Sequence, residues 1–153
     1  MTNNDCLRRI RYILDFNDSK MIAIFGLANV TTDRAEVSAW LKQDDDTDFE
    51  ECSDASFAAF LNGMIVALRG EKQGEPPRVE TKLNNNMVFM KLKIALNLKA
   101  DEILQILEST GQEISKHELS AFFRRPDHKH YRECKDQILR NFLNGLKINY
   151  RDD

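Results

Sequence analysis

The sequence predicts an all-α protein made of two tandem copies of a four-helix unit, packed as a pseudo-twofold helical bundle. Three observations lead to this prediction. The chain matches itself without a gap when it is shifted by 82 positions. Its apolar residues recur at spacings of three and four, which is typical of helices with one buried face. A short segment between the copies, residues 70–78, is rich in glycine and proline and therefore predicts a linker.

The self-match covers polar as well as apolar residues, which indicates internal duplication. Asn3-Asn4 aligns with Asn85-Asn86, and Phe60-Leu61-Asn62-Gly63 is repeated as Phe142-Leu143-Asn144-Gly145. We therefore expect the first repeat over residues 1–69, the linker over 70–83 and the second repeat over 84–153.

The first two helices of repeat one are expected near residues 4–15 and 18–28. In the first, Leu7 and Ile10 fall on one apolar stripe, as residues three or four apart do in a helix. In repeat two, Gly111 follows the second helix and is a plausible C-cap, because glycine readily adopts a positive φ.

The third and fourth helices have start signals in both repeats. Capping-box patterns, Asp33-x-x-Glu36 and Ser115-x-x-Glu118, place the start of the third helix. The fourth helix is expected to begin near Asp54 or Asp136. Its predicted apolar stripe consists of Phe57, Phe60, Leu61, Met64 and Leu68 in repeat one, and of Leu139, Phe142, Leu143, Leu146 and Tyr150 in repeat two.

Two further features recur in both copies. Gly63 and Gly145 lie inside predicted helices, where glycine costs about 1 kcal/mol relative to alanine, so we expect close helix–helix approach there. The pairs Asn3-Asn4 and Asn85-Asn86 are predicted to be helix caps. Because four short helices bury little surface alone, we also expect the two repeats to pack against each other. Separately expressed halves that folded fully without associating would contradict this last expectation.

The composition is that of a soluble globular protein, with 42% hydrophobic and 31% charged residues. Apolar runs are too short to span a bilayer, and the first residues do not resemble a secretion signal. The three cysteines are an odd number without a CxxC pair, which favours free thiols in a reducing compartment. We therefore expect a cytoplasmic protein.

The duplicated pattern resembles a bacterial family, the YehS-like proteins, whose domain has no known function. The resemblance spans almost the whole chain. It rests on Asn3-Asn4-Asp5, Val37-Ser38-Ala39-Trp40-Leu41, Glu51-Cys52-Ser53-Asp54 and Phe60-Leu61-Asn62-Gly63, and in repeat two on Leu96-Asn97-Leu98, Leu119-Ser120-Ala121-Phe122-Phe123-Arg124, Tyr131-Arg132-Glu133-Cys134 and Leu139-Arg140-Asn141-Phe142-Leu143. It implies an all-helical cytoplasmic bacterial protein and no particular activity.

The second and third helices of repeat two have the spacing of a helix-turn-helix. In DNA-binding proteins of that type the second helix enters the major groove and its first polar residues contact bases. Here Lys116, His117 and Ser120 would point outward, with Arg124 and Arg125 near phosphates. The turn is longer than usual, and any two helices joined by a capped turn give a similar spacing, so an ordinary helical hairpin is the alternative.

Charge is distributed unevenly along the chain. Residues 1–75 hold 8 Lys and Arg against 14 Asp and Glu, whereas residues 76–153 hold 14 against 11. The contrast is sharpest between the acidic residues 44–51 and their basic counterparts 126–133. The basic set is a candidate for contact with phosphate or an acidic partner: Lys116, Arg124, Arg125, Lys129, Arg132, Lys135 and Arg140, with Tyr131 for base stacking. A solvated surface or a contact between acidic and basic loops are the alternatives.

Histidine residues of repeat two and cysteine residues near the fourth helix of each repeat raise the question of metal and thiol chemistry. His128, His130 and Cys134, with His117 as a further candidate, are zinc-ligand types, but their spacing matches no standard site, so no metal is expected. The three histidines could also supply a base, but the sequence shows no orienting partner for it. Cys52 and Cys134 precede the fourth helix of each repeat, where a helix N-terminus can activate a thiol. Their symmetric placement favours packing instead.

The sequence thus predicts a non-enzymatic protein-interaction or adaptor module without catalytic residues, cofactor or membrane contact. A protein partner is expected, and a homo-oligomer is compatible with the pattern. The alternative is a weak nucleic-acid-binding protein that uses the helix-turn-helix-like segment and the basic patch of repeat two.

Overall fold

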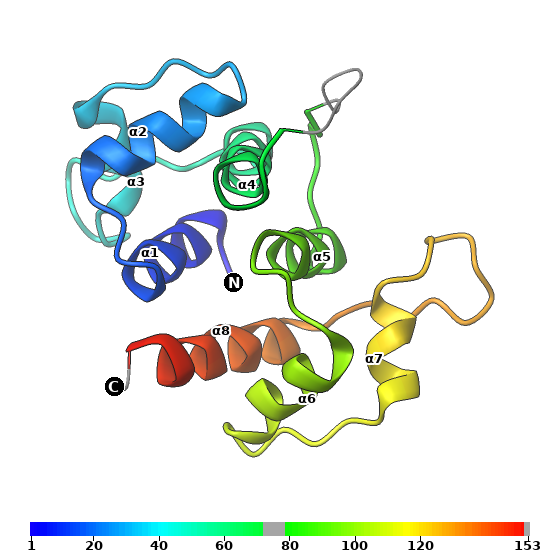
Figure 1. Ribbon diagram of the computed structural model, residues 1–153. Coiled ribbons are helices and arrows are strands. Elements are labelled where there is room, and N and C mark those ends of the chain that lie inside the picture. Colours follow the sequence, from blue (N-terminus) through cyan, green and yellow to red (C-terminus); the bar gives the residue numbers. More distant parts are fainter. Residues whose placement is uncertain (72–78, 152–153) are drawn as a thin grey trace. The chain divides into compact units, whose positions relative to one another are not determined.

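The computed structural model describes residues 1–71 and 79–151, which form eight α-helices (Figure 1). The chain divides into two compact units, Met1–Leu83 and Asn84–Asp153. Unit 1 contains α1 (Asn3–Ile13), α2 (Asp18–Leu27), α3 (Arg34–Leu41) and α4 (Asp54–Arg69). Helix α2 packs on α3 and α4, and α1 packs on the same two helices.

Unit 2 repeats this order with α5 (Asn85–Ala95), α6 (Ala100–Glu108), α7 (Lys116–Phe122) and α8 (Asp136–Arg151). Helix α6 packs on α7 and α8, and α5 packs on α8. Each helix of unit 2 begins 82 residues after its counterpart in unit 1. The predicted all-helical duplication is therefore confirmed. Most of the glycine- and proline-rich segment, residues 72–78, lies outside the described residues.

Helix ends follow local rules, with one correction to the sequence prediction. The N-caps of α1 and α5 are Thr2 and Asn84, whose side chains accept the backbone N–H of Asp5 and Met87. The recurring Asn3-Asn4 and Asn85-Asn86 pairs lie inside the helices and are not caps. The capping box at Ser115 is confirmed, and Asp33 caps α3 by accepting the N–H of Glu36.

Helix α6 closes as predicted at Gly111, which has a φ of 84°. The N–H of Gly111 donates to Glu108 O and that of Gln112 to Leu107 O, a Schellman pair. The matching turn of unit 1 has the same two bonds and uses Asn29, at a φ of 63°. Asparagine tolerates this conformation better than most residues, so the turn is kept without glycine.

The two units fill their cores with aromatic rings from different helices. In unit 1, Phe25 of α2 contacts Trp40 and Phe60, with ring centroids 5.3 and 5.2 Å away. In unit 2 the matching position is Leu107, and Phe89 of α5 takes over as the central ring. It lies 6.3 Å from Phe122 and 4.6 Å from Phe142, which are the counterparts of Trp40 and Phe60.

This exchange is reciprocal. The counterpart of Phe89 in unit 1 is Leu7, so each unit has one phenylalanine and one leucine at these two positions. All four side chains are fully buried. Because one large and one smaller residue trade places, the combined volume of these two side chains is kept, which is the kind of change that close-packed interiors tolerate best.

Gly63 and Gly145 permit close backbone contact, as the sequence predicts. A Cβ atom at Gly63 would lie far inside van der Waals distance of the Ile24 carbonyl oxygen, and one at Gly145 would clash with that of Ile106. These contacts join α4 to α2 and α8 to α6. Each unit thus depends on a glycine at the crossing of its second and fourth helices.

The apolar stripes of α4 and α8 are shorter than predicted. Leu68 and Tyr150, at equivalent positions in the last turns, are each 43% exposed. The other predicted members of both stripes are buried. Of the described helices, none combines the length and the apolar composition that crossing a bilayer requires.

Two residues of the predicted linker form hydrogen bonds with helix α4 of unit 1. The Leu83 N–H donates to Asp54 Oδ2 at 2.9 Å, and Asn62 Nδ2 donates to Glu80 Oε1 at 3.1 Å. Residues 80–83 are therefore bound to α4, which the proline and glycine content of the segment does not reveal.

Candidate functional site

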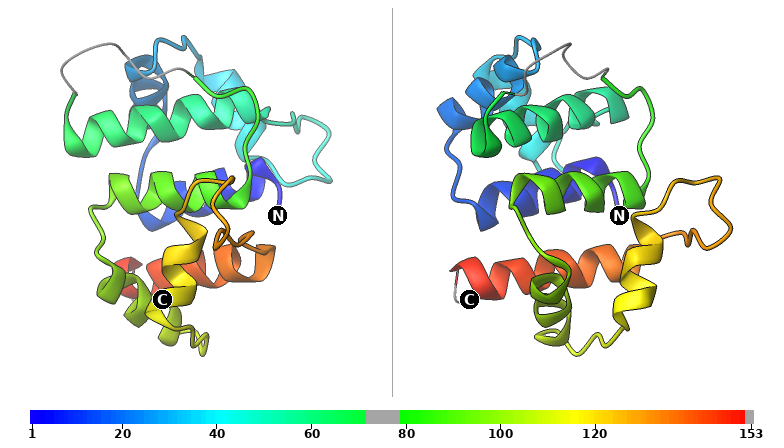
Figure 2. Two further views of the ribbon diagram at one scale, coloured as in Figure 1. Left: turned by 90° about the vertical axis from the view of Figure 1, so that its right-hand side faces the viewer. Right: turned by 45° about the vertical axis from the view of Figure 1, so that its right-hand side comes forward.

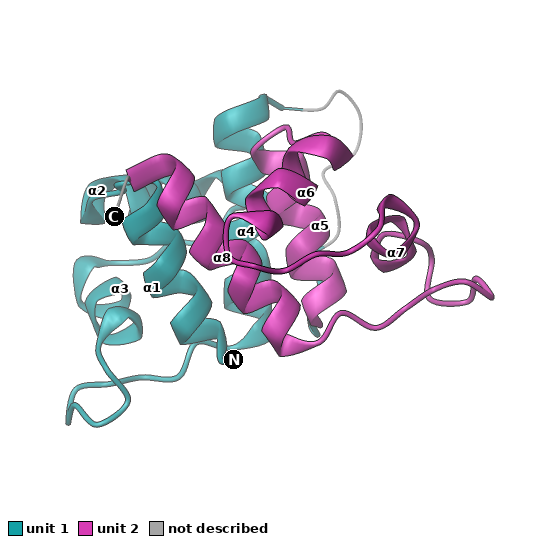
Figure 3. Cartoon of the chain, turned by 90° about the horizontal axis from the view of Figure 1, so that it is seen from below, with its two compact units in different colours: residues 1–83 teal, residues 84–153 magenta. Residues whose placement is uncertain are grey.

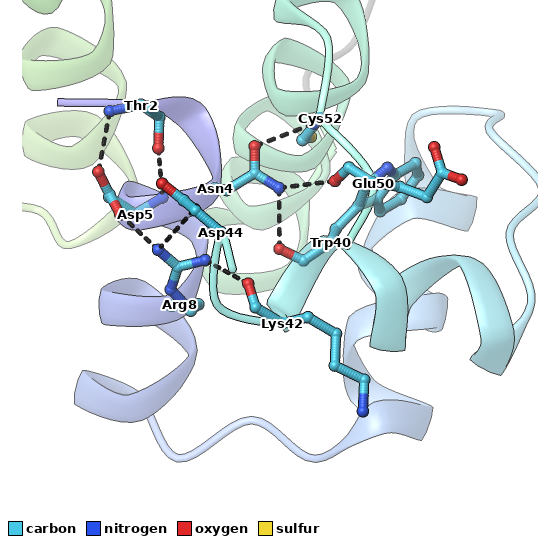
Figure 4. Close-up of polar contacts among 9 residues, drawn as sticks. All are labelled: Thr2, Asn4, Asp5, Arg8, Trp40, Lys42, Asp44, Glu50 and Cys52. Carbon is cyan, nitrogen blue, oxygen red and sulfur yellow. Dashed lines mark hydrogen bonds and ion pairs between the residues drawn. The ribbon is translucent and has the colours of Figure 1, made fainter. Parts of the chain in front are cut away.

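A buried asparagine on the first helix of each unit holds the loop that joins the third and fourth helices. Asn4 Nδ2 donates to the carbonyl oxygens of Trp40 and Glu50, both at 2.9 Å, and its Oδ1 accepts the N–H of Cys52 at 3.0 Å (Figure 4). We call this arrangement the loop clamp. It satisfies main-chain groups at both ends of the loop, and Asn4 is only 1% exposed.

Unit 2 contains the same clamp. Asn86 Nδ2 donates to Phe122 O at 3.0 Å and to Arg132 O at 2.7 Å, and its Oδ1 accepts the N–H of Cys134 at 2.9 Å. The preceding asparagine adds support in both units, since Asn3 and Asn85 donate to the carbonyls of Cys52 and Cys134 at 3.0 Å. The recurring Asn-Asn pairs therefore fix long-range loops.

The clamped loops, residues 42–53 and 123–135, also share their internal turns. Phe49 N–H donates to Asp46 O and Tyr131 N–H to His128 O, at equivalent positions. Even the side-chain bond within the turn is shared: Asp46 Oδ1 accepts the Asp48 N–H at 2.8 Å, and His128 Nδ1 accepts the His130 N–H at 3.0 Å.

Although they share a backbone pattern, the two loops carry opposite charge. Residues 42–53, the acidic loop, contain 6 Asp and Glu and 1 Lys, whereas residues 123–135, the basic loop, contain 5 Lys and Arg and 2 Asp and Glu. Most of these charged side chains are exposed. Each loop projects beyond the helix that precedes it, α3 in unit 1 and α7 in unit 2 (Figure 3), and the basic loop is drawn in orange in Figure 2.

The acidic loop has an additional ionic anchor. Arg8 pairs with Asp5 on its own helix, donates to Lys42 O at 2.6 Å and lies 3.7 Å from the Asp44 carboxylate (Figure 4). In unit 2 the counterparts of Arg8 and Asp44 are Met90 and Pro126. The basic loop therefore relies on the clamp without this anchor.

A pocket of about 140 Å³ lies between α7 and the basic loop. It is lined by His117, Glu118 and Ala121 of α7 and by Lys129, His130, Tyr131 and Arg132 of the loop. Within the described ranges, the side chains of Lys129 and Arg132 form no ion pair. The Glu118 carboxylate is already bound, because it accepts the Ser115 N–H at 3.1 Å. The pocket therefore presents an excess of hydrogen-bond donors and positive charge.

The predicted basic residues separate into two groups. Lys129, Tyr131 and Arg132 line the pocket. Most of the others already have partners, as follows: Lys116 pairs with Asp101 at 3.5 Å, Arg125 with Asp127 at 3.5 Å, Lys135 with Glu133 at 3.4 Å, and Arg140 donates to Gln137 at 3.5 Å. Arg124 is partly buried, and its Nε has no hydrogen-bond partner among the residues described.

The helix-turn-helix-like segment consists of α6, residues 109–115 and α7. Lys116, His117 and Ser120 are exposed, as the sequence predicts. Helix α7 has only seven residues, and the Ser120 hydroxyl donates to the His117 carbonyl oxygen at 3.1 Å. His117 also faces the pocket, where its ring centroid lies 6.3 Å from that of His130. His117 and His130 are grouped from the sequence as candidate metal ligands, and the structure places the two rings near each other at this pocket.

The structure shows how the candidate metal ligands are arranged and how deeply the candidate thiols are buried. In the part of the chain that the structure describes, no three His, Cys, Asp or Glu side chains are arranged to hold a metal ion. Cys52 and Cys134 are 2% and 1% exposed. Burial raises the pKa of each thiol to about 12, with a further contribution from Asp54 or Asp136 respectively. Both cysteines are packing residues whose main chain is held by the clamp.

The comparisons with known proteins agree with the duplication. The family model described as "Protein of unknown function (DUF1456)" matches the chain twice, over residues 3–70 and 85–152. The chain is 43% identical over 147 residues to the uncharacterized protein YehS of Escherichia coli (strain K12), which covers 95% of this chain and 94% of that protein. No solved structure matches. With both repeats matched by the family model, the chain belongs to the DUF1456 family.

Proposed function

We propose that this protein is a non-enzymatic interaction module that binds partners through its acidic and basic loops. The observation that carries the proposal is that two loops with the same clamp and the same turns carry opposite charge. A clamped loop loses little conformational freedom on binding, which favours affinity. Complementary charge steers a partner and selects against a wrong one more than it adds raw affinity.

The test uses three forms of the full chain as bait for cross-linking and mass spectrometry. One is the natural sequence. The acidic-loop variant is Asp45→Asn, Asp48→Asn and Glu51→Gln, which leaves Asp44 and Asp46 in place because their carboxylates support the loop. The basic-loop variant is Arg125→Gln, Lys129→Gln and Arg132→Gln. Partners retained by the natural chain and lost by one loop variant would support the proposal. An identical set of partners from all three baits would contradict it.

A second copy of the chain is included among the partners that this test detects. Sedimentation of the natural chain at low and high salt measures self-association directly. Association that weakens with salt, and that is lost in either loop variant, would identify the acidic loop of one copy as the partner of the basic loop of another.

The second candidate function is weak nucleic-acid binding, favoured by the side chains at the pocket. Tyr131 lies beside two unpaired cations, Lys129 and Arg132, which is a combination suited to base stacking and phosphate contact. Binding to labelled mixed-sequence DNA and RNA over a salt series tests it. Binding that weakens steeply with salt, and that the basic-loop variant alone abolishes, supports this function. Absence of binding at low salt excludes it.

A further inference from the structure

We propose that the pocket between α7 and the basic loop binds the phosphate-monoester group of a ligand. The size of the pocket suits a single small chemical group. At about 140 Å³ the pocket is well below the roughly 300–1,000 Å³ of sites that enclose a drug-sized molecule. It therefore accommodates one small group of a ligand, with the rest of the ligand lying outside.

The lining of the pocket is rich in hydrogen-bond donors. Lys129 and Arg132 supply ammonium and guanidinium donors, and the rings of His117 and His130 and the hydroxyl of Tyr131 supply further N–H and O–H groups. A phosphate monoester carries a charge of about −1.5 to −2 near neutral pH and three strong acceptor oxygens, so it can use several of these donors together. A carboxylate has fewer acceptor sites and less charge.

The cationic donors of the pocket are not consumed by acidic groups of the protein. Among the described residues, neither Lys129 nor Arg132 has an acidic partner, whereas Arg125 and Lys135 of the same loop are paired with Asp127 and Glu133. The acidic residue of the pocket, Glu118, is occupied by the capping box of α7. Lys129 and Arg132 are thus unpaired and line the pocket, whereas Arg124, which also has no acidic partner among the described residues, is partly buried and is not part of the lining.

Unit 1 provides an internal comparison. The positions equivalent to His117, Lys129, His130 and Arg132 are Ala35, Thr47, Asp48 and Glu50. The same backbone therefore carries no cation at these four positions in unit 1. Phosphate binding is expected in unit 2 alone, and replacing the unit 2 loop residues by their unit 1 counterparts introduces side chains that the equivalent loop of unit 1 carries on the same turns.

Inorganic phosphate is the first probe, with backbone amide NMR spectra of the full chain as the readout. Phosphate is expected to shift the amides of residues 117–121 and 128–132 in a saturable manner, and to leave those of residues 35–39 and 46–50 unchanged. Acetate at matched ionic strength is the control for a general anion effect. Lys129→Thr, His130→Asp and Arg132→Glu in one variant should weaken binding by at least about tenfold. Arg125→Gln with Lys135→Gln, which removes loop cations outside the pocket, should change it by less than about threefold.

Two further probes distinguish the source of the phosphate. Tighter binding of O-phosphoserine than of adenosine 5′-monophosphate would support the site and indicate a phosphorylated protein side chain, and the reverse order would support it and indicate a nucleotide. Phosphate shifts that match those of acetate, or that persist in the pocket variant, would overturn the proposal. The inference does not rest on the partner proposal above, because these titrations require no partner protein.

Discussion

The side-chain oxygen of Asn86 accepts the backbone N–H of Cys134 at 2.9 Å, although the two residues are 48 positions apart. This bond closes the basic loop onto α5. Replacing Asn86 by alanine should lower the free energy of unfolding by about 3 kcal/mol, because buried main-chain groups lose their partners. Urea unfolding measures the change, and Asn84→Ala is the control, since loss of this N-cap should cost only about 1 kcal/mol. Equal effects of the two substitutions would contradict the role of the clamp.

Alanine should lower the stability of the protein at the helix-crossing glycines and raise it at Gly26. Gly145→Ala and Gly63→Ala force Cβ into a carbonyl oxygen and should destabilise by about 3 kcal/mol or more. Gly26 lies in α2 with nothing within 4 Å of a Cβ, so Gly26→Ala should stabilise by about 0.5–1 kcal/mol. Thermal unfolding of the three variants measures both signs. A neutral Gly63→Ala would show that α2 and α4 adjust their separation freely.

The exchange of aromatic positions predicts a compensating pair of substitutions in unit 1. Leu7→Phe alone overpacks the core and Phe25→Leu alone leaves a void, so each should destabilise by about 1–3 kcal/mol. The double variant places phenylalanine and leucine as in unit 2. Its loss of unfolding free energy should be smaller than the sum of the two single losses by about 1 kcal/mol or more. Urea midpoints for the four proteins complete the cycle, and strict additivity would count against this interpretation.

The three cysteines should be unreactive in the folded protein. With pKa values of about 12, the thiols of Cys52 and Cys134 are almost entirely protonated near neutral pH, and Cys6 is also buried. A thiol reagent should therefore label them only on the timescale of unfolding, and should titrate all three at once in denaturant. Rapid labelling of one thiol in the native protein would restore thiol chemistry as a function.

Asp54 should contribute to stability in a pH-dependent manner. Its hydrogen bond from Asn3 Nδ2, followed by that from the Leu83 N–H, lowers the pKa of the carboxyl below its ordinary value, against a smaller opposing effect of burial. The stabilisation is therefore present above the unfolded pKa of about 3.9 and is lost as the pH falls through the folded pKa. The urea midpoint should fall more steeply below about pH 5 in the natural protein than in Asp54→Asn. Asp45→Asn is the control, and the same slope in all three proteins would refute the assignment.

Local spacing in the sequence was sufficient for the helices, the duplication and the close approach at Gly63 and Gly145. These features depend on residues three or four apart or on a match at a fixed offset. The clamp was misinterpreted as a cap because Asn4 finds its partners 36 to 48 residues later, where no local pattern can show them.

The candidate site was predictable only in part, for the same reason. Lys129, Tyr131 and Arg132 could be selected from charge and aromatic character. His117 lines the same pocket only because the basic loop folds back along α7, and the periodicity of apolar residues does not predict the course of a loop. The ion pairs that occupy Arg125 and Lys135 were also invisible. The packing of the two repeats against each other stays a prediction.

The clamp contacts carbonyl oxygens and amide hydrogens, and no side-chain atom of the loop it holds. The path of each loop is therefore uncoupled from the identity of most residues along it. After a duplication, one copy could become acidic and the other basic without a new fold having to arise. The same property makes the loop a place for grafting: a foreign recognition sequence of equal length, placed between the two clamped ends, should inherit a defined conformation.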